Sequence, residues 1–332
     1  MLDHRPKMFE EASKTHTSKN LIIIVCTFIA VLFVILLLES IIPGMVTTKP
    51  MLEELEQQGF LDGSKELSWK NSVAIATKVT GRPKIMVPTL LSTAFGTLTA
   101  MFYCRFIEMR PLRSMGARKK KLLPHYLLGL AVGAALMTTI TLLSVAFGAN
   151  SISLCSNIDY KWLPLFFIGF IVQGMSEEFI FRGYLMASVG GSGQHTLIAV
   201  GISAVAFALA HAGNPGFGPV PFINLTLFGV FAAFYVVLFD DIWGICAVHS
   251  IWNFTQGNFY GISVSGTDDL TSVFRTTAVS SKDFLTGGKF GIEGSIFTTV
   301  ALLTGTAILI YAISRKKAQE TVPAEAENND KQ

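Results

Sequence analysis

Long apolar segments recur along the 332 residues of this chain. The first of them, Leu21–Leu38, contains no charged residue. A helix that spans a bilayer needs about 20 largely apolar residues, and inside a bilayer only helices and closed barrels satisfy every backbone hydrogen bond. Hydrophobic residues make up 51% of the sequence and charged residues 15%, which is typical of membrane proteins. We therefore expect an all-α, polytopic membrane protein.

The apolar segments predict about eight transmembrane helices. The polar stretch before Leu21 is too long for a cleavable signal peptide, so we interpret Leu21 as the start of the first span. The fifth and seventh spans are short or polar, and we expect them to be tilted or partly broken. The predicted spans are Leu21–Pro43, Ile85–Phe106, Leu122–Phe147, Leu163–Val189, Thr196–Ala212, Pro221–Phe239, Ile242–Tyr260 and Ser295–Ser314.

Basic residues gather beside three of the predicted span ends. With an even number of spans, all three groups lie on one side of the membrane. Cytoplasmic loops carry an excess of Lys and Arg, so we expect a multi-pass protein of the plasma membrane with both termini in the cytoplasm. We interpret the basic residues as a topology signal rather than a nucleic-acid site. The groups are Arg5, Lys7, Lys14 and Lys19; Arg105, Arg110, Arg113 and 118–121; and 315–317.

Three charged residues interrupt the fourth predicted span: Glu177, Glu178 and Arg182. Each charge at the centre of a bilayer helix costs about 2.5–3.5 kcal/mol on insertion scales, so such residues usually serve a function. Glu178 and Arg182 are four residues apart, share a helix face and are expected to form an ion pair. Glu177 is rotated by about 100° from Glu178, so it can face a cavity as a free carboxylate.

Two histidines and an asparagine lie in other predicted spans. His211 follows Phe207 by one helical turn in the fifth span, and His249 and Asn253 share a face of the seventh. A carboxylate and an imidazole together can deprotonate water, which suits Glu177 and His211. An imidazole and a carboxamide can donate hydrogen bonds to the oxyanion that forms when water attacks a carbonyl, which suits His249 and Asn253.

These residue types leave alternatives open. Glu177, His211 and His249 could also bind a divalent metal such as zinc, although the chain has no His-Glu-x-x-His motif. In an ion-coupled transporter the same Glu, Arg and His residues would relay protons, but such a protein gives no reason for the pair of His249 and Asn253. In a non-enzymatic immunity or scaffold protein, the residues would be buried structure only.

Three motifs together resemble the CPBP family, the CAAX-processing and bacteriocin-processing intramembrane proteases that are also called the Abi family. Each motif fixes only two or three residues, but all three in order on separate predicted helices are specific. The resemblance covers roughly 113–305. The motifs are Glu177-Glu178-x-x-x-Arg182, Phe207-x-x-x-His211 and His249-x-x-x-Asn253.

The resemblance implies an eight-helix endopeptidase that cleaves a membrane-associated peptide or a lipid-anchored protein. In a bacterium this activity would serve peptide or bacteriocin maturation, or self-immunity. The family is commonly labelled a metalloprotease, and a metal-free glutamate mechanism is also argued for it, so a metal such as zinc stays open here. The implied roles are water activation for Glu177 and His211, oxyanion stabilisation for His249 and Asn253, and support of the site for Glu178 and Arg182.

The chain divides into four predicted parts. Residues 1–20 are a cytoplasmic tail, 21–112 hold the first membrane helices with an external loop, 113–314 are the protease core, and 315–332 are a second cytoplasmic tail. We expect this second tail to be disordered, because it is acidic, rich in amides and poor in large apolar residues.

The depths of the motif residues do not agree if every predicted span crosses the whole bilayer. Glu177 would then lie near mid-depth, whereas His211 would lie near the external end of its helix. We therefore expect an irregular segment after His211, where 213–221 are rich in Gly and Pro.

Overall fold

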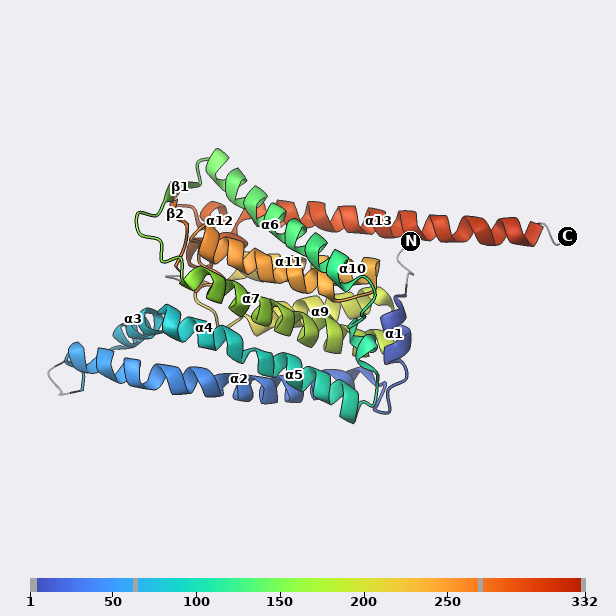
Figure 1. Cartoon of the computed structure of the whole chain (residues 1–332), viewed down its shortest axis with the longest axis horizontal. Coiled ribbons are helices and arrows are strands. Elements are labelled where there is room, and N and C mark those ends of the chain that lie inside the picture. Colours follow the sequence, from blue (N-terminus) through green and yellow to red (C-terminus); the bar gives the residue numbers. More distant parts are fainter. Residues whose placement is uncertain (1–4, 62–64, 268–270, 330–332) are drawn as a thin grey trace.

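A computed structural model describes residues 5–61, 65–267 and 271–329, with side chains up to Gln319. Helices dominate, and many of them run along one common direction (Figure 1). The helices are α1 (Lys7–Ala12), α2 (Leu21–Gln57), α3 (Trp69–Thr80), α4 (Pro83–Ser92), α5 (Ala94–Phe102), α6 (Leu122–Ala146), α7 (Trp162–Glu178), α8 (Ala187–Gly191), α9 (Thr196–Ala210), α10 (Pro219–Phe239), α11 (Trp243–Phe254), α12 (Asp283–Thr286) and α13 (Ile296–Asn329).

Short irregular helices connect or extend these elements. Three are π-helical, and each continues an α-helix directly: η1 (Tyr103–Ile107) follows α5, η3 (Phe179–Met186) follows α7, and η4 (Thr255–Phe259) follows α11. Three are 3₁₀-helical: η2 (Leu112–Met115), η5 (Gly288–Phe290) and η6 (Ile292–Gly294).

The helices confirm a polytopic all-α membrane protein. Within the described part of the chain, six helical segments are long and apolar enough to cross a bilayer, and they coincide with six of the eight predicted spans. The other two are shorter: α9 has 15 residues and α11 has 12. At about 1.5 Å per residue, neither alone reaches across a hydrocarbon core of about 30 Å. The two predicted spans that looked short or polar are thus the two short helices.

Two long helices exceed their predicted ends. Helix α2 continues through Pro43 and Pro50 as far as Gln57, about four turns beyond the predicted end of the span. Glu54 ties this extension to α3 and to the start of α4, because its carboxylate accepts from Lys78 Nζ at 2.5 Å and from Arg82 Nη2 at 2.6 Å. Helix α13 likewise runs on through 315–329, a segment whose composition predicts disorder. The residues just after the last span are Lys, Ala, Gln and Glu, which are strong helix formers.

The two ends of the helix bundle differ. One end carries a two-stranded antiparallel sheet of β1 (Asn150–Leu154) and β2 (Phe274–Ala278), with Asn150 opposite Ala278. The other end, which we call the basic end, holds α1, the 108–121 segment and the α10–α11 turn (Figure 1). Arg110 is fully buried there, pairs with Glu108, and donates to Ser114 Oγ at 2.8 Å.

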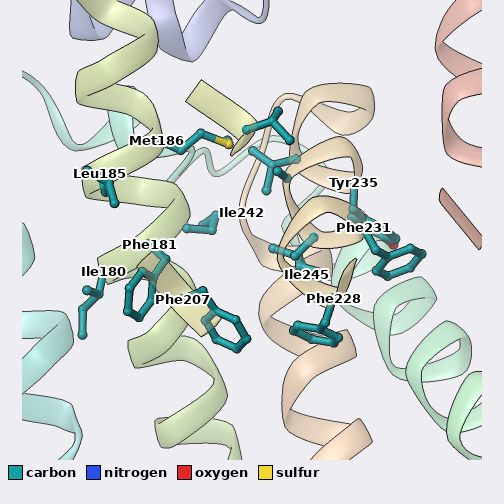
Figure 2. Packing of buried hydrophobic residues seen from close by; sticks show 14 of the residues in the cluster. Ile180, Phe181, Leu185, Met186, Phe207, Phe228, Phe231, Tyr235, Ile242 and Ile245 are labelled. Atoms are coloured by element: carbon teal, nitrogen blue, oxygen red, sulfur yellow. The ribbon is translucent and has the colours of Figure 1, made fainter. Parts of the chain in front are cut away.

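The centre of the bundle is packed by large aromatic side chains. Figure 2 shows Phe207 between Phe181 and Phe228, and the ring centroids are 5.4 Å and 5.7 Å apart. On the other side of α11, Gly129 and Gly133 let α6 approach the α11 backbone closely, since a Cβ at Gly133 would lie 3.0 Å from Val248 Cα. This packing fixes α11 between α6 and the helices that carry Glu177 and His211.

The short helices also remove the expected mismatch in depth. The hairpin turn at 192–195 joins α8 to α9, and Glu177 and His211 lie at almost the same distance along the chain from it, so they come level. Ile242, at the start of α11, lies against Gly183, because a Cβ there would be 3.3 Å from Ile242 Cδ1. His249 lies seven residues beyond Ile242, and Glu177 lies six residues before Gly183. His249 on α11 is therefore also level with Glu177. Helix α9 ends at Ala210, level with Glu177, and the irregular segment 211–218 follows it.

We expect Gly133→Ala to destabilise the protein by about 1–3 kcal/mol, because the added methyl overpacks the contact between α6 and α11. The matched control is Gly201→Ala in α9, where a Cβ would meet nothing within 4 Å. Alanine should be neutral or stabilising at this control position, since it favours helix by about 1 kcal/mol over glycine. Thermal unfolding of both variants in detergent measures the difference. Equal midpoints would contradict the packing of α6 on α11.

Candidate active site

The polar residues of three predicted spans meet at one place in the bundle. Glu177 Oε2 lies 3.8 Å from His211 Nε2 and 3.6 Å from His249 Nε2. Both separations exceed a direct hydrogen bond, and Oε2 has no hydrogen-bond partner within the described residues. The carboxylate oxygen therefore faces two imidazoles but forms a hydrogen bond with neither of them.

The outer nitrogens of both imidazoles are held in place. His211 Nδ1 lies 2.9 Å from the Phe207 carbonyl oxygen, which can only accept, so Nδ1 carries the hydrogen. In neutral His211, Nε2 is consequently an acceptor that faces Glu177. His249 Nδ1 lies 2.8 Å from Glu178 Oε1 and donates to that carboxylate. Each ring thus presents Nε2 to the same point beside Glu177.

Glu178 and Arg182 form the predicted ion pair in a fully buried position. Arg182 Nη1 donates to Glu178 Oε1 at 3.0 Å, and both side chains are inaccessible to solvent. The guanidinium also lies 4.6 Å from the centroid of the Phe207 ring, a favourable cation–π contact. Arg182 compensates the buried charge of Glu178, and Glu178 in turn orients His249.

Gln173 is a site residue that the three motifs did not include. It lies one turn before Glu177 on the same face of α7, and its amide nitrogen donates to Glu177 Oε1. Its carbonyl oxygen accepts from Asn253 Nδ2 at 2.8 Å. Because a carboxylate only accepts, this chain of hydrogen bonds has one direction, from Asn253 through Gln173 to Glu177. A polar residue four positions before Glu177 in an apolar span was the available signal.

A cavity of about 150 Å³ lies over these groups. Its apolar walls include Phe170 and Phe228, and its far wall comes from loops near the β1–β2 end. The turn at Ser265 forms this far wall and is anchored from two sides. Asn214 Nδ2 donates to the Ser265 carbonyl at 3.0 Å, and Ser265 Oγ donates to Glu293 Oε2 at 2.9 Å. These loop residues carry no periodic signal, so the sequence did not single them out.

The arrangement does not fit a metal centre. Glu177, His211 and His249 are the residue types of a zinc shell, and both histidines have the outer hydrogen bonds that metal ligands usually make. Nevertheless, in the described ranges 5–61, 65–267 and 271–329, no group of three or more His, Cys, Asp or Glu side chains is placed to hold a metal ion. The chemistry of the site is therefore derived from the side chains themselves.

Comparison with known protein families gives one match. Residues 159–255 match the family model described as type II CAAX prenyl endopeptidase, Rce1-like. This part of the chain is a CAAX-protease-like domain. This domain begins just before α7 and ends just after Asn253, so it includes Gln173 and every residue of the three motifs. No curated protein and no solved structure matches the chain.

Arg182→Met is expected to destabilise this CAAX-protease-like domain by about 3–5 kcal/mol, because it leaves the Glu178 charge buried without compensation. Adding Glu178→Gln should restore part of the loss, since an amide oxygen can still accept from His249. Thermal unfolding in detergent compares the single and double variants.

The control for this comparison is Lys49→Met, which breaks an exposed ion pair with Glu53 (3.8 Å) and should cost less than about 1 kcal/mol. A midpoint for Arg182→Met that equals that of Lys49→Met would show that the buried pair contributes no more than a surface pair.

Proposed function

We propose that this protein is an intramembrane endopeptidase that hydrolyses a peptide bond of a membrane-associated peptide or protein. One observation carries the proposal: Glu177 Oε2 faces Nε2 of His211 and of His249 at 3.8 and 3.6 Å, beside a cavity in a CAAX-protease-like domain. A carboxylate and a neutral imidazole that face each other as two acceptors are suited to a donor between them. Water is the donor that a hydrolase uses.

In the first step, water donates its two hydrogens to Glu177 Oε2 and His211 Nε2, which leaves its oxygen lone pair for the substrate. This oxygen attacks the carbonyl carbon of the scissile bond while Glu177 accepts the proton. The electron pair of the C=O bond moves onto the carbonyl oxygen. The result is a tetrahedral oxyanion and a protonated Glu177.

Two groups support the oxyanion. His249 in its protonated form donates from Nε2, because Nδ1 already donates to Glu178. Asn253 Nδ2 has two hydrogens, of which one goes to Gln173 and the other remains for the oxyanion. When the intermediate collapses, Glu177 returns its proton to the leaving nitrogen. The peptide bond breaks, and the products are one carboxylic acid and one amine.

Gln173 is a positioning residue in this mechanism. Its amide holds Glu177 Oε1, so Oε2 is the oxygen that faces the water. Asn253 in turn fixes the orientation of the Gln173 amide. The pair would keep the carboxylate within the small range of angles that proton transfer needs.

The placement in the membrane follows from the same proposal. The basic end would lie in the cytoplasm, as the excess of Lys and Arg predicts, with both termini there. The partners of the enzyme are then the lipids of the plasma membrane and a peptide or lipid-anchored protein that reaches the cavity from the bilayer.

Glu177→Gln should reduce turnover about 10²–10⁴-fold, because the amide cannot accept the proton of water. His211→Ala should have an effect of the same order. The assay uses the protein in liposomes with a library of quenched fluorescent peptides, and thermal unfolding verifies that the variants fold. Glu53→Gln, the same change at a surface position of α2, is the control. Turnover by Glu177→Gln at the rate of this control would refute the proposed function.

Gln173→Met keeps the length of the side chain and removes its hydrogen bonds. We expect kcat to fall about 10–100-fold while KM changes little, because the substrate contacts remain and only the carboxylate loses its support. The steady-state kinetics of this variant are compared with those of Gln57→Met, an exposed position in α2. A change in KM alone would assign Gln173 to substrate binding rather than to positioning.

A further inference from the structure

A second hollow, remote from the catalytic residues, lies at the basic end. It has a volume of about 480 Å³ and is formed by four separate segments: the residues around α1, the loop before α6, the α10–α11 turn, and α13. Six basic and three acidic side chains line it, together with His125. The basic residues are Arg5, Lys7, Arg118, Lys120, Lys121 and Lys316, and the acidic residues are Glu10, Asp240 and Asp241.

The two aspartates of this hollow are already occupied by protein groups. Asp240 accepts from the backbone N–H of Met8 at 3.0 Å and pairs with Arg118 at 3.2 Å. Asp241 pairs with His125 and accepts from the Trp243 backbone N–H at 3.1 Å. These contacts hold the walls of the hollow together.

Three of the lysines that line the hollow form no salt bridge with another described residue. Lys7, Lys120 and Lys121 are exposed, and over residues 5–61, 65–267 and 271–329 none of them forms an ion pair. They enter the hollow from two different segments. An excess of positive charge in a concave site favours an anion with several oxygens, such as a phosphate group.

The position of the hollow at the membrane surface further restricts the class of ligand that it can bind. Lys121 directly precedes the apolar helix α6, and Phe239, the last residue of α10, lines the hollow. Leu128, three residues after His125 and therefore on the side of α6 that borders the hollow, is 43% exposed, so an apolar surface continues from the hollow along α6. A ligand that satisfies both features has an anionic head and a hydrocarbon chain.

We propose that this hollow binds the phosphodiester headgroup of an anionic phospholipid. The headgroup contacts Lys7, Lys120 and Lys121, and an acyl chain lies along Phe239 and Leu128. Basic clusters at membrane surfaces attract anionic lipids generally, but this one is concave and built from segments that are distant in sequence. The bound lipid would join α1 to the start of α6.

The test compares two variants that lose the same charge at the same end of the bundle. The first is the triple substitution Lys7→Ala, Lys120→Ala and Lys121→Ala inside the hollow. The control is Lys14→Ala, Lys119→Ala and Arg315→Ala, which lie outside it. Each full-length protein in uncharged detergent is titrated with short-chain phosphatidylglycerol, with short-chain phosphatidylcholine and with glycerol phosphate. Binding is followed by the change in intrinsic fluorescence of the four tryptophans, of which Trp243 donates its indole N–H to the Arg118 carbonyl beside the hollow.

We expect the wild type and the control to bind phosphatidylglycerol, and the hollow variant to bind it about 10- to 100-fold more weakly. Phosphatidylcholine should bind no protein well. Equal weakening in both triple variants would overturn the proposal in favour of general surface charge. Glycerol phosphate that binds as tightly as phosphatidylglycerol would overturn the lipid assignment and indicate a soluble phosphate. Native mass spectrometry of lipids that remain with the purified proteins gives a second readout.

Discussion

The buried carboxylate of Glu178 is the constraint on which the arrangement of the site depends. It is inaccessible to solvent and accepts from Arg182 on its own helix and from His249 on α11. A buried charge is costly without a countercharge and a hydrogen-bond donor, so the contacts of Glu178 favour one fixed register of α7 and α11. Close glycine packing holds α11 from its other side. The hydrogen bond from His249 to Glu178 thus also places the His249 ring beside Glu177.

The two neighbouring glutamates have opposite surroundings because they lie on different faces of one helix. Glu178 faces protein and is neutralised by a local cation, whereas Glu177 faces the cavity and directs Oε2 toward the two imidazoles. Gln173 restrains the other oxygen of Glu177. One carboxylate therefore serves the packing of the helices, and the second is kept oriented and available.

Much of this arrangement was predictable from the sequence, for physical reasons that can be stated. Helical spacing predicts the pair of Glu178 and Arg182, and the cost of burying charge marks the segment as functional. Spacing also shows that His249 and Asn253 share a face. Contacts between helices could not be predicted from spacing within one helix. One example is the hydrogen bond from Asn253 to Gln173, which lies on another helix. The end of α9 at Ala210 lies close to the predicted end at Ala212, and the expected irregular segment follows it. The sequence did not reveal that His211 comes level with Glu177, because this depends on how the helices pack. The turn at Ser265, which forms the far wall of the cavity, lies in a loop and shows no helical or strand periodicity in the sequence.

The early end of α9 has a consequence for how water and products travel. The segment 211–218 is non-helical and begins level with Glu177, inside the bundle, and Ala212, Gly213, Pro215 and Gly216 are exposed. Irregular backbone at such depth persists only where it is buried in protein or borders an aqueous space. In the proposed membrane orientation, these exposed residues would border an aqueous space rather than lipid. For the proposed hydrolase, such a space would let water approach Glu177 without crossing lipid, and it would give the charged ends of a cut peptide a polar exit.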